Sequence, residues 1–96
     1  MRFEWDREKS DRNFRDRGFD FGAASQIFVG RTLERQDTRR DYGEPRVIAV
    51  GAVEGVVLTV VYTDRKSRGG ETVRRIISAR RSNRYERKRF EAIASE

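Results

Sequence analysis

The spacing of apolar residues changes several times along the chain, and each change predicts a different element. Phe3-Glu4-Trp5 alternates between apolar and polar residues, as a short strand does. Asp6 can cap a charged helix over residues 7–17, with Trp5 and Phe14 as its apolar anchors, and Gly18 is suited to end that helix. Apolar residues spaced by three, four and seven over 21–28 predict a second helix.

A β pattern begins at residue 46. The runs 47–50 and 56–63 are rich in β-branched residues, and a turn at Glu54-Gly55 between them predicts a hairpin. Residues 71–79 predict a third, antiparallel strand after the Gly69-Gly70 turn. These three strands are expected to form the centre of the sheet.

The remaining segments complete the predicted fold. Residues 30–43 contain few apolar side chains and predict a loop with at most a brief strand around 32–34. Ser82 or Asn83 can cap a last helix, in which Phe90 and Ile93 would face the sheet. We therefore predict a single α+β domain over residues 1–96. Its antiparallel sheet of three to four strands would pack against two N-terminal helices and one C-terminal helix.

Charge is distributed unevenly along the chain. The net charge is +6, but residues 65–91 contain eleven basic and three acidic residues, a net charge of +8. A concentrated positive field attracts polyanions, which points first to nucleic acid and second to an acidic protein. Nearly all the basic residues are arginine, whose guanidinium suits bidentate contacts with phosphate.

The absence of cysteine and histidine narrows the possible chemistry. It excludes disulfides, thiol nucleophiles, imidazole bases and nearly all zinc sites, so we expect neither a metal nor a cofactor. Residues 1–18 are charged throughout, and no apolar run approaches the roughly 20 residues of a membrane span. We therefore expect a cytoplasmic protein with no contact to a membrane.

Several short motifs occur together in the order and spacing of a known family. Singly these motifs are weak, but in combination they make the chain resemble the BrnT toxins over residues 3–91. The residues that carry the resemblance are Phe3-Glu4-Trp5-Asp6, Lys9, Asn13, Gly18-Phe19-Asp20-Phe21, Ala24, Tyr42-Gly43-Glu44, Tyr62-Thr63, Arg65, Arg75-Ile76-Ile77-Ser78-Ala79-Arg80 and Glu86.

The resemblance implies a RelE-like fold and a ribonuclease toxin that inhibits translation without a metal ion. It also implies a BrnA-like antitoxin with a ribbon-helix-helix fold, which forms a heterotetramer with the toxin and makes the contact with DNA. The family usually has Lys-His-Gly at the end of the first helix, whereas this chain has Asp16-Arg17-Gly18. If that histidine is catalytic in relatives, Arg17 replaces it here, other groups act instead, or activity is weakened.

Metal-independent RNA cleavage needs a proton acceptor, a proton donor and stabilisation of an anionic phosphorane. Arginine suits the last task, so Arg65, Arg75 and Arg80 are predicted to bind the scissile phosphate, with Ser78 as a hydrogen-bonding helper. Tyr85 or Glu86 is predicted to lie closest to proton transfer, for which Glu44, Tyr62 and Lys9 are further candidates. The predicted RNA-binding residues are Arg74, Arg81, Arg84, Arg87 and Lys88.

Strict alternation along the third strand divides these candidates. Arg75 would share one face with Ile77 and Ala79, whereas Ser78 and Arg80 would share the other face with Arg74 and Ile76. Arg75, Ser78 and Arg80 can then line one site only if a bulge or the end of the strand intervenes. Without such an irregularity, at least one of the three has a structural role.

Two other functions fit the same charge. The chain could be a noncatalytic module that holds RNA or DNA through phosphates, although its strands carry few of the exposed aromatics on which single-stranded bases stack. It could also be a protein whose basic surface serves mainly to bind an acidic antitoxin, with catalysis lost. RNA fragments in an assay with pure protein would distinguish the nuclease from both.

Overall fold

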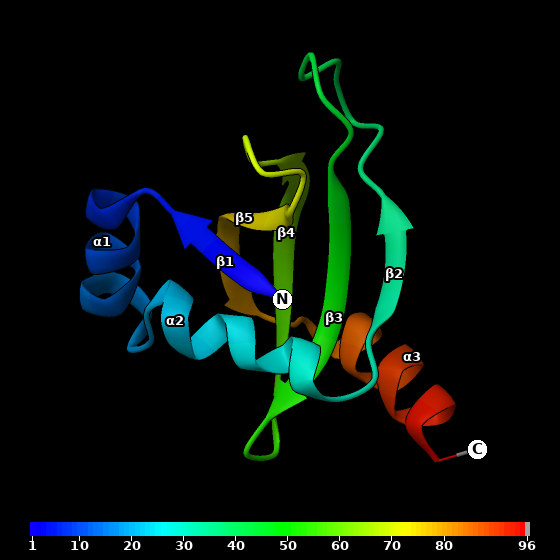
Figure 1. The fold of residues 1–96 in the computed structure, drawn as a ribbon. Coiled ribbons are helices and arrows are strands. Elements are labelled where there is room, and N and C mark those ends of the chain that lie inside the picture. The colour runs from blue at the N-terminus through cyan, green and yellow to red at the C-terminus, as the bar shows by residue number, and fades with distance from the viewer. Residues whose placement is uncertain (96) are drawn as a thin grey trace.

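In a computed structural model, which describes residues 1–95, the chain forms one five-stranded sheet with helices on both faces (Figure 1). The elements are β1 (Arg2–Trp5), α1 (Arg7–Arg17), α2 (Phe21–Ala24), the 3₁₀ helix η1 (Ser25–Val29), β2 (Leu33–Gln36), β3 (Val47–Val53), β4 (Val56–Lys66), β5 (Thr72–Arg81) and α3 (Arg84–Ala94). Among residues 1–95, no helix is both long and apolar enough to cross a membrane.

The sheet is mixed, so the prediction of an antiparallel sheet of three to four strands is wrong. The strand order is β1-β5-β4-β3-β2, and β1 pairs with β5 in parallel, while the other pairs are antiparallel. Parallel neighbours need a long connection, and here nearly the whole domain lies between β1 and β5. The alternation in Phe3-Glu4-Trp5 predicts a strand but carries no information about its distant partner.

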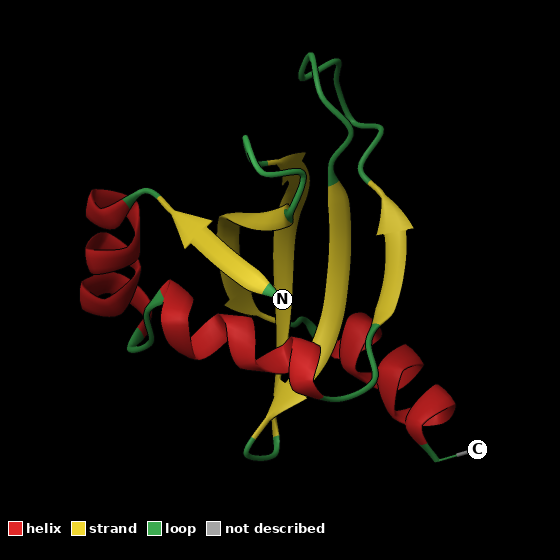
Figure 2. Cartoon of the chain, viewed as in Figure 1, coloured by secondary structure: helices red, strands yellow, loops and turns green. Residues whose placement is uncertain are grey.

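Different helices pack on the two faces of the sheet (Figure 2). α1, α2 and η1 lie on one face, and α3 lies on the other. The main core forms under the N-terminal helices and comprises Phe21, Ala24, Ile27, Ala49, Leu58, Val60, Tyr62, Ile76 and Ala79. A smaller cluster beneath α3 joins Phe90 to Val50 and Val57. Because α3 is short, it covers only part of its face.

Local signals placed the helix ends correctly. The Asp6 side chain accepts a hydrogen bond from the backbone of Lys9, and Gly18 ends α1 with a φ of 86°, in the left-handed region. Asn83, one of the two predicted caps, starts α3 through a capping box with Glu86. The second N-terminal helix is shorter than predicted, because the chain tightens into η1 after Ala24.

The prediction that Phe14 anchors α1 is wrong, since its side chain is 60% exposed. The inner face of α1 is polar instead. Buried Ser10 accepts a hydrogen bond from the backbone of Phe21, and buried Asn13 donates to the carbonyl of Phe19. Trp5, the other predicted anchor, does pack against the main core. Hydrogen bonds to the following loop, and not an apolar stripe, therefore hold α1 in position.

Candidate functional site

A β-bulge in β5 brings three predicted site residues to one face of the sheet. Ser78 pairs with Val61 and Ile76 pairs with Tyr62, so Ile77 is an extra residue without a partner on β4. As a result, Arg75, Ser78 and Arg80 lie opposite Thr63, Val61 and Thr59, which alternate along β4 and so share one face. The bulge that these three residues need in order to line one site is therefore present.

This shared face is the one on which α3 packs, and Arg80 contacts α3 directly. Its Nη1 and Nη2 atoms donate to Oε1 and Oε2 of Glu86, at 2.7 and 2.9 Å. This bidentate bond raises the pKa of Arg80 and, with a hydrogen bond from the backbone of Asn83, lowers the pKa of Glu86 to about 2. Such a weak base is poorly matched to proton transfer at neutral pH. Glu86 instead positions Arg80 and caps α3.

A second guanidinium, that of Arg39, lies within electrostatic range of Arg80. Arg39 donates two bonds of 2.8 Å to the buried carboxylate of Asp37, and this pairing holds the pKa of Asp37 far below its usual range. The charge of Arg39 also lowers the pKa of Arg80, against the larger effect of Glu86. Arg39 lies in residues 30–43, which the sequence predicts to be a loop. Only the Asp-x-Arg spacing could have suggested that it is fixed.

Arg75 and Arg65 lie farther along the same face. Arg75 donates to Glu4 at 2.7 Å, across the parallel β1–β5 pair. Arg65 donates to Glu44 at 3.0 Å and is the main cause of that carboxyl's lowered pKa. Arg65 is six residues from Thr59, the β4 partner of Arg80, which corresponds to about 20 Å along the strand. Arg65 and Arg80 thus mark opposite ends of the face.

Tyr62 and Arg74 belong to the other face. The Tyr62 hydroxyl donates to Glu34 at 2.6 Å, and burial together with this bond raises the pKa of Tyr62 far above its usual value. Arg74 donates two bonds to Asp64, at 2.8 and 2.9 Å, and its guanidinium lies 4.0 Å from the centre of the Tyr62 ring. Tyr62 thus belongs to the main core, and Arg74 lies at its border. They lie on the opposite face of the sheet from Arg80 and Glu86.

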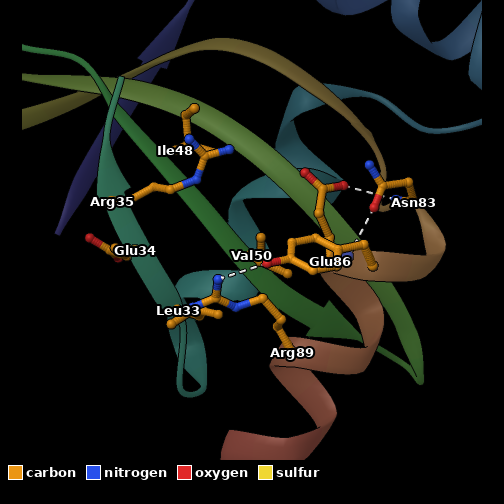
Figure 3. Close-up of a pocket in the computed structure, with 9 residues that line it drawn as sticks. Leu33, Glu34, Arg35, Ile48, Val50, Asn83, Glu86 and Arg89 are labelled. Carbon is orange, nitrogen blue, oxygen red and sulfur yellow. Dashed lines mark hydrogen bonds between the residues drawn. The ribbon is translucent and has the colours of Figure 1, made fainter. Parts of the chain in front are cut away.

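A pocket of about 190 Å³ opens between β2, β3 and α3 (Figure 3). Tyr85 lies at this pocket with 67% of its surface exposed, and its hydroxyl oxygen accepts a hydrogen bond of 3.1 Å from Arg89. The lining residues are Leu33, Glu34, Arg35, Ile48, Val50, Asn83, Tyr85, Glu86 and Arg89. Of these, only Tyr85 and Glu86 were predicted. Arg35 was missed because β2 carries just one clearly apolar residue, Leu33.

A second pocket, of about 130 Å³, lies between α1 and β5, and Lys9, Arg12, Arg17 and Ser78 are among the residues that line it. Arg17 occupies the position where the family resemblance leads us to expect histidine. Its Nη1 donates to Asn13 Oδ1 at 2.8 Å and to the Ala79 carbonyl at 3.3 Å. Ser78 thus borders this pocket, although the register places it on the same face of the sheet as Arg80.

The predicted RNA-binding residues at the C-terminal end form an exposed cationic rim. Arg84, Arg87 and Lys88 are exposed on α3, and Arg81 is exposed at the end of β5. Arg87 also donates to the Ser82 carbonyl at 2.9 Å. Within residues 1–95, no three His, Cys, Asp or Glu side chains are grouped so that they could hold a metal ion.

The chain was compared with models of protein families and with curated proteins. A family model described as the ribonuclease toxin BrnT of type II toxin–antitoxin systems matches residues 5–86. A search of curated proteins finds no match. The matched range contains α1 to β5 and all the lining residues of both pockets except Arg89, and it ends at Glu86 in the first turn of α3.

Proposed function

We propose that this chain, which belongs to the BrnT family of ribonuclease toxins of type II toxin–antitoxin systems, cleaves RNA without a metal ion on the sheet face that carries α3. The observation that carries this proposal is the bulge at Ile77. It gives Arg75, Ser78 and Arg80 a common face, next to Tyr85 and Glu86 on α3.

Arg80 binds the scissile phosphate in this proposal. Its guanidinium is held in place by Glu86, yet 45% of its side chain remains exposed to a ligand. Arg39 adds a second positive charge nearby. The 2′-hydroxyl gives its proton to solvent water and attacks phosphorus, the bond from phosphorus to the 5′-oxygen breaks, and these charges stabilise the anionic phosphorane between the two events. Arg75 and Ser78 contact the flanking backbone, and Arg65 lies too far from Arg80 to grip the same phosphate.

Tyr85 is the proton donor that the geometry favours. Its oxygen accepts from Arg89, which leaves its own O–H free to donate to the leaving 5′-oxygen. Glu44, Glu86 and Tyr62 fit proton transfer poorly, because Arg65 and Arg80 lower the pKa of the two carboxyl groups and burial raises that of the phenol. Lys9 lies on α1, beside Ser78.

The partners of the carboxylates on this face support metal independence. Glu4 binds Arg75, Glu44 binds Arg65, and Glu86 binds Arg80. A divalent cation would have to displace a guanidinium from each of these oxygens. Fixed arginine charges therefore take the place that a metal ion has in other nucleases.

Membership of this family implies an antitoxin partner. We propose that it is a BrnA-like ribbon-helix-helix protein, that two copies of each chain assemble, and that the antitoxin alone contacts DNA. The antitoxin would silence the toxin by covering the cationic face around Arg80. Released in the cytoplasm, the toxin would inhibit translation by cutting RNA.

Labelled RNA incubated with the pure chain in excess EDTA tests this proposal. Wild type should produce fragments, Arg80→Ala and Tyr85→Phe should cleave about a hundredfold more slowly, and the triple alanine variant at Arg65, Arg75 and Arg80 should be inactive. Arg68→Ala removes a charge from an exposed turn outside the site and should cleave normally. Unchanged cleavage by the triple variant would overturn the proposal.

Other outcomes would identify a different function or place. A gel shift without fragments would support noncatalytic RNA binding. Loss of cleavage in Lys9→Ala and Arg17→Ala, with normal cleavage in Arg80→Ala, would move the active site to the pocket between α1 and β5. No RNA cleavage and no growth arrest on expression would leave antitoxin binding as the remaining role.

A further inference from the structure

The pocket between β2, β3 and α3 combines an apolar floor with an exposed aromatic ring. Leu33, Ile48 and Val50 from the two strands form the floor, and Tyr85 stands at the rim. Proteins that bind unstacked RNA bases combine these same features, because a base has two apolar faces and a polar edge. The proposed function uses Tyr85, Glu86 and Arg89 on α3 but assigns no role to the strand side of this pocket.

Two arginines reach over the pocket from opposite sides. Arg35 extends from β2 and Arg89 from α3 (Figure 3). Within residues 1–95, the Arg35 side chain has no hydrogen-bond or ion-pair partner, whereas the side chains of Arg65, Arg75 and Arg80 each hold a carboxylate. A guanidinium without a partner, next to buried Ile48, is free to bind a ligand.

The polar groups around this pocket are donors. Arg35 and Arg89 can only donate, and the oxygen of Asn83 already accepts from the backbone of Glu86, which leaves its NH₂. The two carboxylates are occupied: Glu34 accepts from Thr32 and Tyr62, and Glu86 accepts from Arg80. Unpaired donors therefore predominate around the pocket, and they favour a ligand that presents hydrogen-bond acceptors.

We propose that this pocket binds one nucleobase of the RNA and prefers guanine. Guanine presents two adjacent acceptors, O6 and N7, which a guanidinium such as that of Arg35 can bind together. With the same major-groove edge turned towards Arg35, adenine and cytosine would present an amino group to donors, and uracil would present O4 without an acceptor beside it. The inference rests on the proposed function, since it assigns a base preference to the same RNA.

The position of the pocket also sets where that base lies. Glu86 both lines the pocket and holds Arg80. A base in the pocket therefore belongs to a nucleotide next to the phosphate bound by Arg80. The chain should cleave RNA preferentially beside guanine.

Binding of mononucleotides to the full chain, followed by amide chemical shifts, tests the pocket without cleavage. GMP should shift the amides of Leu33, Arg35 and Val50, and should bind about tenfold more tightly than AMP, CMP or UMP. Arg35→Lys keeps the charge but loses the bidentate fork, so it should lose the preference. Arg68→Ala, the control, should retain it.

Each remaining result is decisive. Equal binding of all four nucleotides, or shifts confined to other residues, would overturn the inference. So would an Arg35→Lys variant that keeps its preference for GMP. If wild type shows this preference but cleaves no RNA, the pocket is correct and the proposed function fails. If it cleaves RNA without preference for guanine, the proposed function stands and the guanine pocket is wrong.

Discussion

Arg80 on β5 and Glu86 on α3 form a bidentate ion pair, with bonds of 2.7 and 2.9 Å, that ties the last helix to the sheet. The same carboxylate accepts the Asn83 backbone N–H and so starts α3. One acidic side chain thus fixes both the proposed phosphate ligand and the helix that carries Tyr85. Its main effect is to position other groups.

This pair makes stability depend on acid pH. The pKa of Glu86 in the folded chain is about 2, below its ordinary value of 4.5, so its stabilisation is complete above about pH 4.5 and is lost as pH falls through 2. Glu86→Gln should lower the free energy of unfolding by about 1 kcal/mol at pH 7, a figure reduced because Arg80 is partly exposed. Urea titrations at several pH values should show the difference from wild type vanish near pH 2. A difference that persists there would contradict the ion pair as its source.

The cationic rim on α3 should give RNA binding a measurable salt dependence. Glutamine at Arg84, Arg87 and Lys88 should reduce the slope of log K against log salt by about 2, since each phosphate contact on a single strand contributes roughly 0.7. Fluorescence anisotropy with labelled RNA at several salt concentrations measures this slope.

A matched control removes the same charge elsewhere. Glutamine at Arg7, Arg15 and Arg68, all exposed outside the rim, should leave the slope almost unchanged. If both triple variants lose the same slope, binding follows net charge and the rim has no special role.

Replacement of Phe14 should leave the free energy of unfolding almost unchanged. Its side chain is 60% exposed, so Phe14→Ser should change the free energy of unfolding by less than about 0.5 kcal/mol. Phe21, 2% exposed, is the control, and Phe21→Ala should cost about 3–5 kcal/mol. Chemical denaturation compares the two variants. A large loss in Phe14→Ser would show that Phe14 is buried after all.

The presence of a residue at position 77 should be essential for folding, whereas the side chain of Ile77 should not be. Deletion of Ile77 forces either Ile76 or Ala79 away from the main core, which should abolish cooperative unfolding. Ile77→Ala keeps the register and should cost only about 1 kcal/mol. Thermal unfolding followed by circular dichroism checks both. A deletion variant as stable as wild type would mean that the register around Ile77 is different.

Local patterns were enough to predict most elements of the fold. The strands around 47–53, 56–66 and 72–81, and the helices 7–17 and 84–94, lie close to their predicted positions. Caps explain this success, because Asp6, Gly18 and Asn83 act on backbone groups only a few residues away. The short strand β2 and the tightening into η1 gave much weaker signals.

The candidate site was predicted less completely. Arg75, Ser78 and Arg80 were named from the sequence, but Arg35, Arg39 and Arg89 were not. In an arginine-rich chain, charge alone cannot separate a guanidinium that is bound to a carboxylate, such as that of Arg74, from one that is free, such as that of Arg35. The distinction depends on neighbours far away in the sequence.

The sequence by itself determined most of the secondary structure, the location of positive charge in residues 65–91 and the family resemblance. Only the tertiary structure decided that β1 joins β5 in parallel, and that the extra residue Ile77 turns Arg75 to the face of Ser78 and Arg80. Both are consequences of pairing between strands. Pairing is set by which distant segments bury their apolar sides together, and the core required Ile76 and Ala79 on one face, which strict alternation forbids.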